Sequence, residues 1–396
     1  MLPDSVSRLF SPELRDALVA LRRDLHQHPE LSSEEHRTSE CLRVALEAVR
    51  PASLDRVAGT GLVARIAGRD PGSPVVAIRG DIDALPIQEA TGLPFASRRP
   101  NVMHACGHDV HAAWAVGAAH LLARAPAEGD VLVVLQPAEE TGRGAAAVLK
   151  SGALDQARAI FGGHVDRRFA VGQVVAEAGP LAAAADVFEI ELTGRGGHGA
   201  RPHEGADPIV GAGALVGALQ TIVSRRLDPA RAAVVTVGTI RAGSAPNVIP
   251  DRALLQGTLR SVDPDTRQAL HEELRRIAGG VAATYGLTAR VTIDLGPPPI
   301  VNPAETAAWA RTATVMLLGQ HALVPLGALN MGGEDFAQYM ERMPGCFLRI
   351  GAREEGGERI PAHSGRFYAA EESLFVGAAV LAETARVASN ALATGA

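Results

Sequence analysis

The stretch VVAIRGDID, residues 75–83, decides the fold class. Its first four residues are apolar and mostly β-branched, and they lead directly into a segment that carries Asp81 and Asp83. The same arrangement of a short apolar run and a following polar side chain occurs twice more: Val131 to Leu135 before Glu139-Glu140, and Ile160-Phe161 before His164. Short apolar runs bounded by Gly or Pro and separated by helical patterns are typical of buried parallel strands. The sequence therefore predicts an α/β fold with a mainly parallel sheet, and a site at the edge where these strands end.

The pattern changes at about Ala185. Residues 187–192 read as a strand, 208–225 as a helix, 233–240 and 252–259 as strands, 264–285 as a helix and 289–295 as a strand. This βαββαβ order is the split ferredoxin-like arrangement, and three prolines at 297–299 then form a stiff linker. We predict a larger α/β domain, residues 1–183 and 297–396, interrupted by a small α+β domain, residues 184–296.

Composition excludes several function classes. The chain has 396 residues, 47% hydrophobic and 21% charged, which is the balance of a globular protein. The net charge of −6 does not indicate the excess of basic residues that is typical of nucleic-acid-binding proteins. No run of about 18 apolar residues and no signal-peptide pattern occurs, so no membrane is expected. Three widely spaced cysteines make no disulfide framework, which favours a reducing, cytoplasmic location.

The segment MHACGHDVH, residues 103–111, is the densest group of candidate ligands. On a helix, His104, His108 and His111 would share one face and Cys106 would point away. At a helix start, Cys106 and His108 could instead converge on one ion. The alternative without a ligand is an N-capping aspartate with surface histidines, or a buried reactive cysteine. Thiolate and imidazole together favour zinc-like metals.

Further candidates follow the predicted strands. The adjacent Glu139 and Glu140 are either a solvated loop or a pair in which one carboxylate ligates an ion and the other takes a proton from water. Asp81 and Asp83 face the same way on an extended segment, or belong to a turn and helix cap. Five ligands would be too many for one tetrahedral zinc and enough for two bridged ions; they are Cys106, His108, Glu140, His164 and His363.

The segment 194–199, GRGGHG, formally matches a dinucleotide-binding fingerprint and follows a predicted strand. That fingerprint requires a helix to open at its last glycine. Here Arg201-Pro202 intervenes and the helix starts near Pro208, so we expect a glycine-rich loop that presents His198 outward.

Six segments in this order resemble the metal-dependent aminoacylase and carboxypeptidase superfamily, and within it the hippurate hydrolases, N-acyl-amino-acid amidohydrolases and auxin-conjugate hydrolases. They are residues 80–86, 103–111, 139–140, 194–203, 247–250 and 333–336, and the resemblance extends from about residue 26 to 375.

The resemblance implies a dinuclear-metallopeptidase-like catalytic domain interrupted by a lid domain through which subunits form a homodimer or homotetramer. By position, Cys106 matches the ligand that bridges two divalent ions (zinc, manganese, nickel or cobalt), and four further ligands match His108, Glu140, His164 and His363. Glu139 matches the general base and Asp83 the aspartate that orients a metal ligand. His198 and Asn247 match lid residues that hold the substrate and its oxyanion, commonly in a partner's site.

The implied activity is hydrolysis of the amide bond of N-acyl amino acids by metal-activated water. The alternative within the superfamily is a dipeptidase, aminopeptidase or carboxypeptidase, and outside the enzymes a metal-free binding protein on the same scaffold. Thr141, in place of a glycine, and the neighbours of His363, Ala362 and Gly365, depart from the usual pattern without removing a ligand. Arg241 and Arg260 are candidates for binding the substrate carboxylate.

Overall fold

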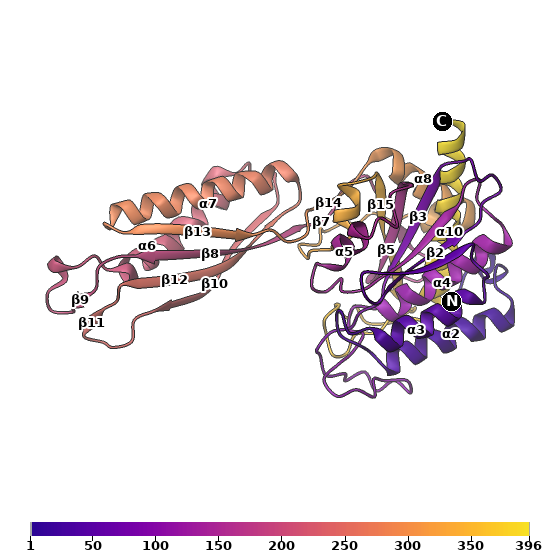
Figure 1. Cartoon of the computed structure of the whole chain (residues 1–396), viewed down its shortest axis with the longest axis horizontal. Helices are drawn as coiled ribbons and strands as arrows, with labels where there is room; N and C mark the ends of the chain where they lie inside the picture. The colour runs from indigo at the N-terminus through magenta and orange to yellow at the C-terminus, as the bar shows by residue number, and fades with distance from the viewer. Residues whose placement is uncertain (1, 396) are drawn as a thin grey trace. The chain divides into compact units, whose positions relative to one another are not determined.

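The computed structural model of the chain describes residues 2–395 and divides into two compact units (Figure 1). The first unit holds the chain up to Gly179, Asn302–Ala328 and the chain from Asp335 onward. The second holds Pro180–Val301 and Leu329–Glu334. The second unit thus begins and ends a few residues outside the predicted insertion, 184–296, and includes a short segment that the sequence analysis assigned to the larger domain.

A seven-stranded sheet forms the centre of the first unit. Its strands, in spatial order, are β1 (Ser53–Val57), β2 (Gly61–Ile66), β4 (Val131–Gln136), β3 (Val75–Asp81), β5 (Ala157–Ala170), β15 (Gly345–Arg353) and β6 (Val174–Val175). The four central strands, β4, β3, β5 and β15, run parallel, and the outer pairs are antiparallel. Every residue of β4 is buried, as expected for a parallel strand covered on both faces. The predicted α/β class with a mainly parallel sheet is confirmed.

Helices cover this sheet (Figure 1). They are α1 (Asp4–Ser7), α2 (Pro12–Gln27), α3 (His36–Glu47), α4 (His108–Arg124), α5 (Gly144–Lys150), α8 (Ala304–Leu318), the 3₁₀ turn Gln320–Ala322, α9 (Ala337–Met340) and α10 (Glu372–Thr394). Local sequence sets their starts: α2 begins where the Ser11 side chain accepts a hydrogen bond from the Leu14 amide and Pro12 takes the first helical position. The Ala-rich helices α4 and α10 pack against each other and are mostly buried.

Several strand assignments differ from the sequence-based expectation. Strand β5 continues to Ala170, so His164 lies inside the strand and not beyond its C-terminal end. Strands β1 and β2 were not predicted; β1 has only one buried residue and therefore lacks an apolar run.

The second unit has the predicted βαββαβ order. Its elements are β8 (Ala184–Thr193), α6 (Pro208–Thr221) continued by a π turn (Ile222–Arg226), β10 (Ala233–Ala242), β12 (Arg252–Ser261), α7 (Pro264–Thr284) and β13 (Thr288–Asp294). The four strands form an antiparallel sheet in the order β10-β12-β8-β13, with β10 and β13 at its edges. Two short ladders join β9 (Gly197–His198) to β11 (Val248–Ile249) and β7 (Gly179–Ala182) to β14 (Ile300–Asn302). A 3₁₀ turn, Pro202–Glu204, precedes α6.

The second unit has its own hydrophobic core, with Phe188, Leu215, Leu255 and Leu274 fully buried in it. By length and composition alone, one helical stretch of the described residues could span a bilayer: Pro208–Arg226, with mean hydropathy 1.2. Leu215 of this stretch belongs to the core of a folded α+β unit. The length and hydropathy of the stretch are therefore only weak evidence for a membrane span.

Candidate metal centre

Four elements of the first unit bring the five predicted ligands together. Cys106 lies in the turn before α4 and His108 is the first residue of that helix. Glu140 lies in the turn after β4, His164 within β5, and His363 in the long connection between β15 and α10. The structure therefore selects the helix-start alternative for residues 103–111, in which Cys106 and His108 converge.

Gly107 makes that convergence possible. Its φ of +92° is a left-handed conformation, and a Cβ at this position would lie 2.4 Å from a methyl carbon of Val165. Only glycine therefore fits between Cys106 and His108 without strain. The turn it forms lets the cysteine side chain and the first side chain of α4 point to the same place.

The ligand atoms form two groups that share Cys106. One group is Cys106, His108 and His164, and the other is Cys106, Glu140 and His363; within each, the ligand atoms lie within 4.8 Å of one another. The Cys106 sulfur is 3.2 Å from His164 Nε2, and His363 Nε2 is 3.3 Å from Glu140 Oε2. One sulfur between two such groups is the arrangement expected of a bridging ligand.

Two polar atoms in this cluster support metal binding. His108 Nε2 and Glu140 Oε1 are buried and make no hydrogen bond within the described part of the chain. Buried polar atoms without a partner are costly, and in native proteins each calls for a reason such as a bound ion. Thiolate, imidazole and carboxylate are together a donor set for divalent metals of zinc-like character. The residues fit divalent metal ions.

Asp83 contacts two of the five predicted ligands, His108 and Glu140. Its backbone oxygen and Oδ1 lie 2.9 and 3.2 Å from His108 Nδ1, so Nε2 is left to face the site. Its Oδ2 accepts hydrogen bonds from the Glu140 amide at 3.0 Å and the Ser32 hydroxyl at 2.6 Å. Burial alone would raise the pKa of Asp83, but these hydrogen bonds outweigh it and hold the pKa below its usual range. Such a partner fixes the ring orientation of a ligating histidine.

Glu139 lies beside the ligands without belonging to either group that shares Cys106. Its Oε2 is 3.9 Å from His108 Nε2, and its Oε1 accepts a hydrogen bond from the Asp335 amide at 3.4 Å. Ala138, before it, has a φ of +53°, which is uncommon for a residue with a side chain. The Glu139 and Glu140 carboxylates both lie 3.9 Å from His108 Nε2.

Two of the five predicted ligands have raised pKa values. Burial raises the pKa of the Cys106 thiol. Hydrogen bonds to Cys106 and Glu140 raise the pKa of His363 to about 10. Both groups must lose a proton before they can bind an ion.

His104 and His111 do not join the cluster of ligands. His111 Nδ1 is 2.6 Å from Asp81 Oδ1, and its Nε2 accepts a hydrogen bond from the Val165 amide at 3.0 Å, so both ring nitrogens are already used. His104 precedes α4, and burial lowers its pKa to about 4. The helical alternative, with His104, His108 and His111 on one face, is therefore wrong.

The alternative of an N-capping aspartate with surface histidines is also wrong. Asp109 is buried and binds Arg22 Nε at 2.7 Å and His26 Nδ1 at 2.8 Å, and all three histidines of the segment are buried. Asp81 likewise serves structure, because its carboxylate pairs with the buried Arg79.

A buried network that the sequence analysis did not assign lies next to Glu139. Asp335 accepts hydrogen bonds from Arg79 at 3.0 Å, from the Gln136 side chain at 2.8 Å and from the Ala145 amide at 2.9 Å. In the sequence, Asp335 was marked only by its place in segment 333–336, one of the six segments that resemble the superfamily. The resemblance assigned no role to it. The network fixes the backbone that donates to Glu139.

His198 and Asn247 lie in the second unit. His198 is on β9, opposite Val248 of β11, and the Gly199 amide donates to the Asn247 backbone oxygen at 2.8 Å. The structure thus places the two side chains on adjoining segments, both exposed. The helix after the glycine-rich segment begins at Pro208, as the sequence predicts, and not at the last glycine of the segment.

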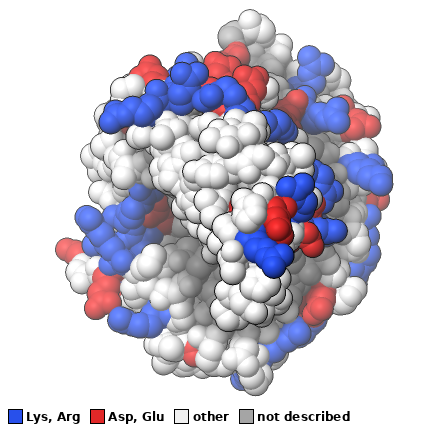
Figure 2. All heavy atoms as spheres, turned by 90° about the vertical axis from the view of Figure 1, so that its left-hand side faces the viewer, with Lys and Arg blue, Asp and Glu red and all other residues white. Residues whose placement is uncertain are grey.

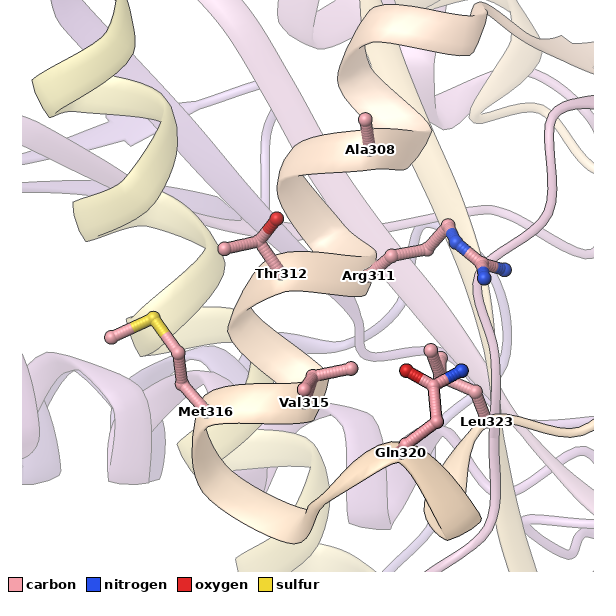
Figure 3. A pocket seen from close by; sticks show the side chains of 7 residues that line it. All are labelled: Ala308, Arg311, Thr312, Val315, Met316, Gln320 and Leu323. Atoms are coloured by element: carbon pink, nitrogen blue, oxygen red, sulfur yellow. The ribbon is translucent and has the colours of Figure 1, made fainter.

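A shallow depression on α8 is separate from these residues (Figure 3). It has a volume of about 370 Å³ and is lined by residues that include Arg311, Thr312, Met316 and Gln320. None of its lining side chains is acidic, a histidine or a cysteine, so it has no ligands for a metal ion apart from the cluster around Cys106.

Comparison with known proteins gives consistent relatives. The chain is 43% identical over 373 residues to an N-acetylcysteine deacetylase of Bacillus subtilis (93% of this chain, 96% of that one). It is 38% identical over 381 residues to an IAA-amino acid hydrolase of Arabidopsis thaliana (95% and 86%). It is also similar to the crystal structure of the Bacillus subtilis YXEP protein, described as a dinuclear metal binding peptidase of the M20 family, with a TM-score of 0.85, 38% identity and coverage of 96% and 99%.

A family model also matches most of the chain. Residues 77–387 fit the model for peptidase family M20/M25/M40. The matched range contains all five ligands, Glu139 and the second unit. The protein therefore belongs to peptidase family M20/M25/M40, as a hydrolase with a divalent-metal site.

Proposed function

We propose that this protein hydrolyses the amide bond of N-acyl amino acids, releasing the free amino acid and a carboxylic acid. The observation that carries the proposal is the pair of ligand groups that share Cys106, with Glu139 beside them. Relatives that are over 35% identical along most of this chain are named as a deacetylase of N-acetylcysteine and a hydrolase of IAA-amino acids. Acetylated and aromatic acyl-amino acids are therefore the substrates to test first.

Two divalent ions, one for each group, would supply Lewis-acid polarisation of the substrate carbonyl and a lowered pKa for the attacking water. Zinc, manganese, nickel and cobalt all suit the donor set. Glu139 takes the proton from the water as it attacks and then passes it to the leaving amine. The Asp335 amide holds the Glu139 carboxylate in place during both transfers, and Asp83 keeps His108 turned toward the site.

The second unit would supply the contacts that select the substrate. His198 and Asn247 would hold the substrate and its developing oxyanion. Of the two candidates for the substrate carboxylate, Arg260 on β12 is half-buried. Arg241 is exposed on β10.

The same unit would form the interface of a homodimer or homotetramer. Strand β10 is an edge of the sheet and exposes Val234 and Ile240, while α6 exposes Ile209 and Val210. Figure 2 shows a broad uncharged area framed by charged side chains. Exposed edge strands and apolar patches are typical of association sites.

A cytoplasmic location fits the three cysteines, which are all free.

The test is hydrolysis of a small panel after chelation and after return of zinc, manganese, cobalt or nickel. We expect N-acetyl and N-benzoyl amino acids to be cleaved only with metal, and dipeptides with a free amino terminus to be poor substrates. Cleavage of dipeptides alone would replace the proposal with a peptidase. Full activity in a thoroughly metal-free sample would refute the mechanism.

A further inference from the structure

The His363 side chain is 55% exposed, whereas Glu140, its partner in one ligand group, is 9% exposed. It lies in the connection between Arg353, the end of β15, and Glu372, the start of α10, which contains no helix or strand. Long connections of this kind in compact domains are usually functional or mobile. A ligand there needs a separate means of being held in place.

The backbone at His363 adds to that requirement. Its φ of +64° is left-handed, a conformation that residues with a side chain adopt at a cost. The His363 amide donates to the Ala105 backbone oxygen at 2.8 Å, and the Ala90 amide donates to the Gly365 oxygen at 2.7 Å. These bonds fix the tip of the connection, and its two arms need an anchor of their own.

Arg167 provides that anchor. It lies on β5, three positions after the ligand His164, and its side chain is 1% exposed. Its guanidinium donates to the backbone oxygens of Glu358 at 2.8 Å and Tyr368 at 3.2 Å, one on each arm of the connection. It also donates to both carboxylate oxygens of Glu354, at 2.8 and 3.1 Å.

Tyr368 completes the arrangement. Its ring lies 4.1 Å from the Arg167 guanidinium carbon, and its hydroxyl donates to Glu354 Oε1. Partial burial would raise the pKa of Glu354, but the hydrogen bonds from Arg167 and Tyr368 lower it to about 2, so the carboxylate is charged throughout the neutral range. Glu354, before His363 in the connection, and Tyr368, after it, are therefore joined through the buried Arg167 guanidinium.

We propose that Arg167, Glu354 and Tyr368, the Arg167 clamp, are positioning residues that hold His363 in place and so determine how tightly one of the two ions binds. The affected ion is the one assigned to Cys106, Glu140 and His363. The other, assigned to Cys106, His108 and His164, has no ligand in the connection between β15 and α10, which is the segment that the clamp holds. The inference rests on the proposed pair of ions.

The experiment uses the full chain and compares Glu354→Gln and Tyr368→Phe with the wild type. Each variant is dialysed against a series of free Mn²⁺ concentrations, and bound metal is counted per chain. Spin-coupled pairs are distinguished from isolated ions by electron paramagnetic resonance. We expect one of the two ions to bind roughly 10–100-fold more weakly, the usual effect of losing a partner that supports a ligand, with isolated Mn²⁺ replacing the coupled pair.

Arg366→Ala is the matched control. Arg366 lies in the same connection, but its bond to Glu358 at 2.9 Å joins two exposed side chains, and such pairs contribute little. It should bind both ions as the wild type does.

Three outcomes would overturn the proposal. In the first, both variants keep two ions of wild-type affinity and lose only thermal stability. In the second, both ions weaken equally, or Arg366→Ala weakens one as much as the clamp variants do. In the third, a Glu354→Gln chain that does not fold is accompanied by wild-type binding in Tyr368→Phe, which loses a single oxygen atom. A wild type that binds no second ion would instead refute the proposed pair of ions.

Discussion

Cys106 belongs to both ligand groups of the first unit, so replacing its sulfur tests both at once. We expect Cys106→Ser to lose at least one ion per chain, because an alcohol oxygen is a far weaker ligand than a thiolate for zinc-like metals. Activity should fall by on the order of 100-fold or more. Metal analysis after gel filtration measures the first effect and amide hydrolysis the second.

The companion variant is Cys346→Ser, whose side chain is buried away from the cluster, on β15. It should keep its metal content. Full metal content and activity in Cys106→Ser would show that the sulfur is not a ligand. An oxidant should inactivate the wild type if the thiolate is accessible.

Metal binding should release protons at neutral pH. Without metal, His363, with a pKa of about 10, and the Cys106 thiol, with a raised pKa, both hold their protons at pH 7. An ion must displace them, so affinity falls as pH falls. Titration calorimetry in two buffers of different ionisation enthalpy should report a net release of protons that persists to pH 8. Equal heats in both buffers would contradict it.

The sequence predicted the candidate ligands, but it did not predict the residues that hold those ligands in position. The residues themselves suggested all five candidate ligands and the resemblance assigned their roles, but the residues left open whether 103–111 was a helix or a helix start. The left-handed Gly107 lies at that helix start, where a Cβ would be 2.4 Å from a methyl carbon of Val165. Arg79 and Asp335, 256 positions apart, meet only in the folded chain. No local pattern encodes such a pair.

Among the elements, α2 and α4 are joined by a buried ion pair that should be costly to break. Asp109 accepts hydrogen bonds from Arg22 and His26, and both Arg22 and Asp109 are 1% exposed. Asp109→Asn leaves the buried Arg22 guanidinium with only the longer contact to Glu371, at 3.6 Å, so we expect the free energy of unfolding to fall by about 3 kcal/mol. Urea denaturation monitored by circular dichroism measures it.

The comparison is Asp24→Asn, which breaks an ion pair with Arg37 in which both side chains are about 40% exposed. It should cost at most about 1 kcal/mol. Similar losses in both variants would mean that the buried pair contributes no more than a surface one.

The strands show where patterns succeed at this scale. Strand β4 was predicted because Val131 to Leu135 are all apolar, and every residue of the strand is buried. Strand β5 was predicted too short, since beyond Phe161 it contains glycines and charged residues, and its pairing with the distant β15 keeps it extended to Ala170. A strand held by a partner so far along the chain has no signal of its own in the sequence.

For the whole molecule, the decisive question is which subunit supplies His198 to a given site. If the partner does, two inactive variants should restore activity when mixed. Glu139→Gln lacks the general base and His198→Ala lacks a substrate contact, so a mixed dimer has one site with both groups intact. After random reassociation, about half of the dimers contain one chain of each variant, and each of these has one active site out of two. We therefore expect up to about a quarter of wild-type activity.

A mixture as inactive as its components would place His198 in its own subunit's site or show that subunits do not exchange. Light scattering of a mixture of tagged and untagged chains separates these cases. A monomer at all concentrations would remove the dimer from the proposal.

The interruption of the first unit also governs the order in which the chain can fold. Strand β15 lies between β5 and β6 in the sheet, yet the ribosome makes it only after the entire second unit. Domains generally fold as units while they emerge, so the inserted unit, which has its own core, can be complete while the sheet of the first unit still lacks an inner strand. His363, the last ligand along the chain, follows later still. Metal loading therefore belongs to the end of synthesis, when the final helix closes over a sheet begun some three hundred residues before.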